Sequence, residues 1–179
     1  AEGLRRSQSP AGFLDNLDTN FNSPADTAFG VRAAANGLLL AKKANASELF
    51  SIMQPFLKSA SDGLAVGGIH TPNHRWVLCA ALAQMNEILP EEAYVRRIKQ
   101  WLAETIDIDP DGQYSERSAL GYNAIVDSAL IAIADRQGIE LGDKLNAMFG
   151  IRDPAKLTIT EASGLIDELK GAAGNGGRR

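Results

Sequence analysis

The sequence predicts an all-α protein, arranged as a two-layer array of antiparallel helical pairs. Three observations support this class: strand signals are nearly absent, helix-start signals recur, and strongly apolar helical segments alternate with amphipathic ones. The chain has 179 residues, of which 45% are hydrophobic and 22% charged. This composition suits one soluble domain that buries a real core.

Helix-start signals give the order of the elements. "SP" at 23–24, Ser47, "TP" at 71–72 and "LPEE" at 89–92 place a capping oxygen, a proline or acids where the first N–H groups of a helix lack partners. The predicted helices cover residues 24–43, 48–62, 72–89, 91–106 and 116–137, and two shorter ones cover 140–149 and 160–170.

The predicted helices differ in how much of their surface is apolar. "WVLCAALAQMNEIL" (76–89) and "AIVDSALIAIA" (124–134) are apolar almost all round, which predicts inner helices. Helices 48–62 and 91–106 carry one apolar stripe each, which predicts outer helices. The stripes are Leu49, Ile52, Met53, Phe56 and Leu57 in the first, and Tyr94, Ile98, Trp101, Leu102 and Thr105 in the second.

The predicted inner helices start about 44 residues apart, a spacing typical of helical-pair arrays. An open solenoid and an arc of a closed α/α toroid both satisfy this periodicity. We assign residues 1–137 to the helical domain and 138–170 to a short C-terminal helical segment. The tail 171–179, "GAAGNGGRR", has no apolar residue larger than alanine, so we expect it to be disordered.

Charge and composition exclude several partners. A net charge of −4 argues against nucleic acid, because such binders neutralise many phosphates with Lys and Arg. No stretch approaches the ~20 apolar residues that cross a bilayer, so we expect no membrane partner. The only cysteine, Cys79, lies in an apolar run and predicts a buried, inert thiol. The location stays open, and a secreted or periplasmic product with its signal removed fits the start at Ala1.

Residues 107–118 begin as D-x-D-x-D-G, the opening of a calcium loop. Ser118 stands where that loop needs a bidentate Glu, so three carboxylates lack the closing ligand. The alternative is an Asp-Pro-Asp-Gly turn, with Pro110 presetting φ and Gly112 taking a left-handed conformation. We favour the turn, and we expect no bound metal and no cofactor.

The candidate functional residues fall at two predicted helix starts. Thr71 and Pro72 would put Asn73 and His74 in the first turn of an inner helix, where free N–H groups favour an anion. If alternate helices run antiparallel, the start of 116–137 lies beside this turn. The residues that would then face Asn73 and His74 across a groove are Glu116, Arg117, Ser118 and Tyr122.

Each of these residues also has an ordinary structural interpretation. Asn and His near helix starts often satisfy only local backbone groups, and a Tyr in an apolar helix is usually core with a bonded hydroxyl. His70, which follows two glycines and Ile69, is interpreted as a loop residue.

"TPNHRWV", followed about forty residues later by "DGQYSERSALGYN", resembles the helical domain of heparinase II/III-like polysaccharide lyases. The resemblance covers roughly residues 10–137 and implies a partial (α/α) toroid that binds an acidic polysaccharide or oligosaccharide. It also implies chain cleavage by β-elimination next to a uronic acid. Family members have more helical pairs and usually a β-sandwich, and we expect neither after residue 140. An inactive, incomplete fragment is therefore an alternative to an active lyase.

The resemblance assigns roles to individual residues. Asn73 and His74 match the positions that neutralise the uronate carboxylate, so that the C5 proton can be removed. Tyr122 matches the tyrosine that exchanges a proton with the substrate, and Tyr114 is the second candidate for that role. The remaining substrate-binding candidates are Arg75, Glu116, Arg117 and Ser118.

Two other hypotheses remain. A non-catalytic helical repeat could bind protein or glycan along its groove, with the same side chains scattered or buried. Binding of single-stranded nucleic acid through residues 155–170 is disfavoured by the acidic balance and by the sparse aromatic residues near basic ones. If an incomplete cleft exposes apolar inner faces, we expect self-association.

Overall fold

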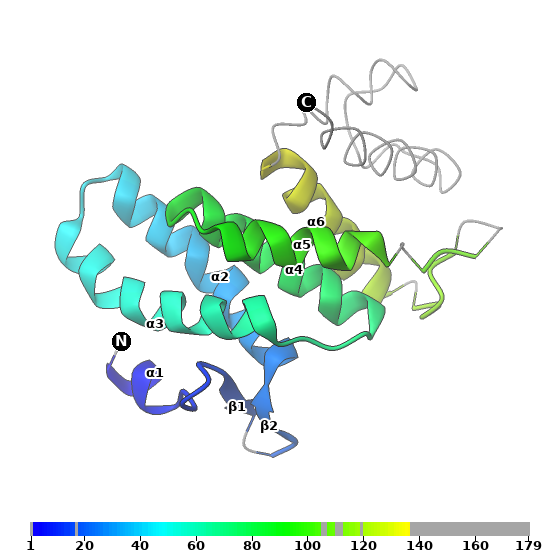
Figure 1. The fold of residues 1–179 in the computed structure, drawn as a ribbon, viewed down its shortest axis with the longest axis horizontal. Helices are drawn as coiled ribbons and strands as arrows, with labels where there is room; N and C mark the ends of the chain where they lie inside the picture. Colours follow the sequence, from blue (N-terminus) through cyan, green and yellow to red (C-terminus); the bar gives the residue numbers. More distant parts are fainter. Residues whose placement is uncertain (1, 17, 105–106, 110–112, 119, 137–179) are drawn as a thin grey trace. The chain divides into compact units, whose positions relative to one another are not determined.

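A computed structural model describes residues 2–16, 18–104, 107–109, 113–118 and 120–136 (Figure 1). Two compact units divide the chain, Ala1–Glu104 and Thr105–Arg179, and each is described by itself. The helices predicted over 140–149 and 160–170, the segment 138–170 and the tail 171–179 lie outside the described residues.

The described fold is all-α, as predicted. In the first unit the short helix α1 (Glu2–Arg6) and strands β1 (Leu14–Asn16) and β2 (Asn20–Ser23) precede four longer helices. These helices are α2 (Pro24–Lys43), α3 (Ser47–Val66), α4 (Pro72–Ile88) and α5 (Glu92–Ala103). Successive long helices reverse direction, so α2 with α3 and α4 with α5 form antiparallel pairs (Figure 1).

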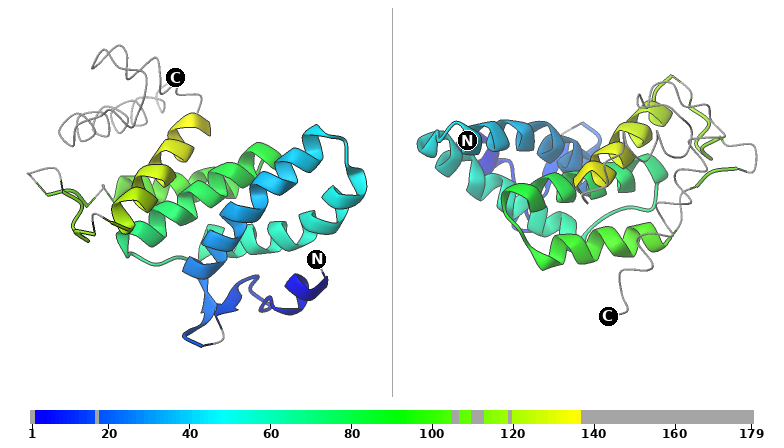
Figure 2. Two further views of the ribbon diagram at one scale, coloured as in Figure 1. Left: turned by 180° about the vertical axis from the view of Figure 1, so that it is seen from behind. Right: turned by 90° about the horizontal axis from the view of Figure 1, so that it is seen from above.

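Helix α4 is the inner helix of this unit. It packs against α2, α3 and α5, and Figure 2 shows it between α2 and α5. Its buried residues occupy every side of the helix and include Trp76, Leu78 and Met85, each at most 1% exposed. The prediction of an inner helix at 76–89 is therefore confirmed, and Cys79 is buried as expected.

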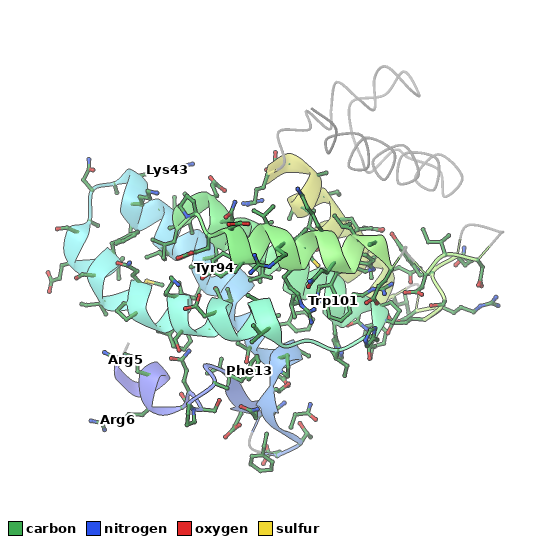
Figure 3. All side chains as sticks on the ribbon, viewed as in Figure 1. Arg5, Arg6, Phe13, Lys43, Tyr94 and Trp101 are labelled. Carbon is green, nitrogen blue, oxygen red and sulfur yellow. The ribbon has the colours of Figure 1, made fainter. Side chains whose placement is uncertain are left out.

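Helix α5 shows most of the predicted outer stripe: Tyr94, Ile98 and Trp101 are buried and Leu102 is half-buried, while Thr105 lies outside the described residues. Figure 3 shows Trp101 directed from α5 toward the segment that joins α3 and α4. In α3 the predicted stripe is only partly right. Phe56 and Leu57 are buried, but Leu49 and Ile52 are 48% and 45% exposed.

The antiparallel hairpin of β1 and β2 was not predicted. It pairs Leu14 with Ser23 and Asn16 with Asn20. Phe13 precedes the hairpin and is buried beside α3 (Figure 3). Its ring lies close to Gly63 and Gly67. A Cβ at Gly63 would collide with the Ala11 carbonyl oxygen. This close approach requires glycine at position 63, and α3 continues to Val66, past the predicted end at residue 62.

The second unit contains helix α6 (Tyr122–Arg136). Residues 116–118 are not helical, so the predicted start at residue 116 is wrong. Before the helix the chain forms a hairpin in which Ile108 pairs antiparallel with Tyr114. The Asp109 N–H donates to the Gln113 carbonyl at 2.7 Å, and the Ser115 N–H donates to the Asp107 carbonyl at 2.9 Å. These bonds hold residues 113–115 in an extended pairing that excludes helix.

Candidate functional site

The start of α4 carries the first group of candidate residues. Pro72 occupies the first turn with Thr71 as N-cap, as predicted, but the Thr71 side chain makes no capping hydrogen bond. Asn73 and His74 lie in the first turn, also as predicted. Asn73 is 2% exposed, which makes it a buried amide.

His74 is half-buried against α2. Its ring meets Phe29 edge to face, with centroids 6.3 Å apart. Within the described residues its Nδ1 atom is buried and has no hydrogen-bond partner. His74 thus places an imidazole in the first turn of α4.

The first turn of α2 supplies an acid near His74. The pKa of Asp26 is lowered chiefly by a hydrogen bond from Ser23, whose Oγ lies 2.6 Å from Asp26 Oδ2, and additionally by Asn20, Asn16 and the charge of His74. Because the ionised form of Asp26 is stabilised, a negative charge lies near the imidazole at neutral pH. Asp26 was not among the residues predicted to be functional.

Arg75 is tied to the end of α5. Its Nη1 donates to Glu104 Oε2 at 3.2 Å, and the Arg75 side chain is only 4% exposed. The same carboxylate oxygen lies 2.9 Å from His70 Nδ1. His70 also meets the Trp101 ring at 5.0 Å. The Arg75 guanidinium thus already binds a carboxylate of the protein. Its contact with a substrate stays a prediction.

The segment between α3 and α4 is held against α5 by further contacts. Arg97 donates from Nη2 to the Gly67 carbonyl at 2.6 Å, and its guanidinium lies 4.4 Å from the centre of the Trp101 ring. Gly68 has a φ of 139°, and a Cβ there would lie 2.6 Å from Trp101 Cζ2. Residues 67–71 are therefore fixed by the last two turns of α5 just before α4 begins.

In the second unit, Tyr114 and Tyr122 differ in environment. Tyr114 donates its hydroxyl to Asp127 Oδ1 on α6 at 2.5 Å. Burial, with the Asp127 hydrogen bond and charge, raises the pKa of the Tyr114 phenol. Tyr122, at the first position of α6, is 48% exposed. Tyr114 is thus held as a protonated phenol, whereas the Tyr122 side chain reaches solvent.

The other candidates of this unit have local partners. Arg117 donates from Nη2 to Asp109 Oδ2 at 2.5 Å and has a φ of 48°. Ser118 accepts from the Tyr122 N–H at 3.4 Å through its Oγ and from the Asn123 N–H at 3.2 Å through its carbonyl. Glu116 is half-buried. Ser118 therefore accepts hydrogen bonds from the first two backbone N–H groups of α6.

The hairpin geometry bears on the calcium hypothesis. Ile108 pairs antiparallel with Tyr114, and the Asp109 carboxylate is bound to Arg117. Pro110, Asp111 and Gly112, which would form the predicted turn, lie outside the described residues. Among the residues that the structure does describe, no three His, Cys, Asp or Glu side chains are grouped to hold a metal ion.

No family model, curated protein or solved structure matches this chain. Within the described part of the chain, no helix has the length and apolar character needed to span a bilayer. The structure brings together Asn73, His74 and Arg75 in one helical turn, and Tyr114, Arg117, Ser118 and Tyr122 around the start of α6. Sequence reasoning missed Asp26, Glu104 and Asp127, because nothing in their local sequence marks them as partners of distant residues.

Proposed function

We propose that this chain binds a uronate-containing polysaccharide and forms the helical part, a partial (α/α) toroid, of a lyase that cleaves the polymer by β-elimination. The motifs "TPNHRWV" and "DGQYSERSALGYN" support the proposal through their resemblance to heparinase II/III-like lyases. The structural observation that carries it is His74, which lies in the first turn of α4 and has an unpartnered buried Nδ1.

The chemistry requires a donor to the substrate carboxylate. In β-elimination a base removes the C5 proton, the electron pair forms the C4–C5 double bond, and the glycosidic oxygen leaves C4 with a proton. Negative charge develops on the uronate carboxylate, so an N–H aimed at it stabilises the transition state. An imidazole N–H of His74 would supply such a donor, and the partial positive charge of the α4 N-terminus supplements it.

Tyr122 is the tyrosine that this proposal assigns to proton exchange. Its side chain is exposed, whereas the phenol of Tyr114 is bonded to Asp127. A tyrosine that must give a proton to the leaving oxygen needs access to the substrate. We therefore assign Tyr122 to catalysis. Tyr114 would instead help to position α6 through its hydrogen bond to Asp127.

The test measures the ultraviolet absorbance of the unsaturated product with alginate, heparan-type and chondroitin-type polymers. Wild type is compared with Tyr122→Phe and His74→Ala, and Leu40→Ala serves as a control because Leu40 is an exposed residue of α2. Product formed by wild type and Leu40→Ala, and lost in both other variants, is the expected result. Wild-type protein that neither binds nor cleaves any of these polymers contradicts the proposal.

A second candidate function, non-catalytic binding of a glycan, is favoured by one specific observation. Three predicted substrate-contacting groups already have partners in the protein, because Arg75 binds Glu104, Arg117 binds Asp109 and Ser118 accepts from the Tyr122 N–H. Binding of a polymer without any unsaturated product, measured by affinity electrophoresis beside the absorbance assay, would select this function.

A further inference from the structure

One carboxylate in the first unit is held by two donors from the start of α4 and the segment before it. Glu104 Oε2 lies 2.9 Å from His70 Nδ1 and 3.2 Å from Arg75 Nη1. An ionised carboxylate only accepts hydrogen bonds, so both nitrogens donate to it. Charge-assisted bonds of this kind are stronger than neutral ones.

Arg75, the cation that binds Glu104, is buried in the core. The Arg75 side chain is 4% exposed, and its guanidinium lies 4.7 Å from the centre of the Trp76 ring. A buried cation requires an anion beside it, because an unpaired charge is costly away from water. The other members reach solvent, since the side chains of His70 and Glu104 are 78% and 40% exposed. The buried arginine is thus fixed, while the anion lies where a solute could replace it.

The helix dipoles favour an anion beside Arg75 but disfavour the carboxylate of Glu104 at the end of α5. Arg75 lies in the first turns of α4, whose N-terminus attracts an anion. Glu104 is the C-cap residue of α5, and the negative end of a helix repels a carboxylate. Glu104 therefore gains little from its own helix, and its position is explained by its two partners on the other segment.

The segment that carries His70 is also held in place by α5. Trp101 contacts His70 edge to face, and Arg97 holds the Gly67 carbonyl at 2.6 Å. Gly68 lies so close to Trp101 that a side chain would not fit. Preorganised donors lose little entropy when an anion binds.

We propose that His70 and Arg75 form a carboxylate-binding site that the protein fills with its own Glu104, and that a uronate carboxylate takes the place of Glu104. Glu104 is thus an internal competitor of the ligand. The choice of a uronate rests on the proposed function, whereas carboxylate binding at this place requires no elimination. It assigns His70, which sequence reasoning treated as a loop residue, to ligand binding.

The experiment uses Glu104→Ala in the full chain, with thermal unfolding and calorimetric titration as readouts. Acetate and glucuronate are the probes, and glucose is the neutral control. We expect both carboxylates to raise the unfolding temperature of Glu104→Ala more than that of wild type, and glucose to change neither. Glucuronate should bind the variant about tenfold more tightly than wild type, because a competing charged pair is gone.

Two further variants give the matched controls. Glu92→Ala removes an acid from the same helix that is 93% exposed, and it should respond to acetate as wild type does. Glu104→Ala combined with Arg75→Met removes the buried cation and should lose the carboxylate response. If Glu104→Ala does not fold, Glu104→Gln replaces it, since the amide fills the same space.

A folded Glu104 variant whose stability and glucuronate affinity match those of wild type would overturn the inference. A response that survives the loss of Arg75 would overturn it as well. These outcomes are independent of the lyase proposal, because acetate cannot undergo elimination. Conversely, a carboxylate response without any lyase product would leave this site standing and contradict only the proposed reaction.

Discussion

The two helix starts that carry the candidate residues are built in different ways. The start of α4 is enclosed: Asn73 and Arg75 are 2% and 3% exposed, and the segment before it is clamped by α5. The start of α6 is open, with Tyr122 and Leu120 48% and 103% exposed, and a hairpin precedes it. A buried helix start holds donors in fixed positions, whereas an exposed one gives a reactive side chain access to a ligand.

The largest expected difference between these helices is in stability. Trp76→Ala removes a fully buried side chain from α4 and should lower the free energy of unfolding by about 3–5 kcal/mol, through lost burial and the cavity left behind. Ile131→Ala in α6, where the residue is 40% exposed, should cost less than about 1 kcal/mol. Urea unfolding followed by circular dichroism measures both. Equal losses would break the comparison.

The segments before the two helices should respond differently to an added methyl group. Gly68→Ala forces a φ of 139° on alanine and a contact with Trp101, so it should cost about 1–3 kcal/mol. Gly121→Ala places a Cβ 3.4 Å from Ser118 Oγ, an ordinary contact, and should stay within about 0.5 kcal/mol. Chemical denaturation of the two variants measures both losses. A Gly68→Ala variant as stable as wild type would mean that the contact of Gly68 with Trp101 does not hold this segment in place.

The start of α4 could be predicted from the sequence and the start of α6 could not. Pro72 fixes φ and needs no N–H donor, so it marks a helix start whatever surrounds it. Residues 116–118 carry no comparable signal, although a helix was predicted from residue 116. The pairing of Ile108 with Tyr114 and the φ of 48° at Arg117 keep the chain out of helix there. A turn was expected within residues 107–118, but neither this pairing nor the positive φ at Arg117 was predicted.

The candidate site divides in the same way. Asn73 and His74 could be placed in a first turn because helix periodicity is local. The Glu104 contacts join residues 29 and 34 positions away along the chain, and only tertiary packing creates them. His70 next to Gly67 and Gly68 looked like loop sequence for the same reason: its partners, Trp101 and Glu104, belong to another helix.

The two tyrosines of the second unit should separate stability from function. Tyr114→Phe removes the hydrogen bond to Asp127 and should cost about 1 kcal/mol, whereas Tyr122→Phe should leave stability unchanged. Because the pKa of Tyr114 is raised in the folded state, chiefly by burial, its contribution is fully present below the ordinary tyrosine pKa of about 10. It is lost as the pH rises from there toward the folded-state value.

Unfolding of both variants and wild type at neutral and alkaline pH checks this. The gap between wild type and Tyr114→Phe should be constant up to pH ~9 and narrow above pH ~10. A gap that widens with alkalinity would contradict the assignment of Tyr114 as a protonated donor. A stability loss in Tyr122→Phe would show that this phenol is structural and would weaken its proposed role in catalysis.

The smallest expected effects concern hydroxyl groups at the starts of α4 and α6, compared with the N-cap of α2. Ser23→Ala, the reference, removes a hydroxyl that accepts from the Asp26 N–H at 3.2 Å, and it should cost about 1 kcal/mol. Ser118→Ala removes a longer bond of 3.4 Å at an exposed site and should cost a few tenths of a kcal/mol, about 0.3. Thr71→Ala should cost nothing measurable, because the Thr71 hydroxyl makes no capping bond.

The order of these three losses tests how the start of α4 is held. If Thr71→Ala costs as much as Ser23→Ala, the hydroxyl of Thr71 caps α4 in solution, and the helix start is fixed by its own residues. If it costs nothing while Gly68→Ala is strongly destabilising, the start is fixed by α5 through Arg97, Trp101 and Glu104. In the second case, any ligand that displaces Glu104 from Arg75 also loosens one of the contacts that position Asn73 and His74.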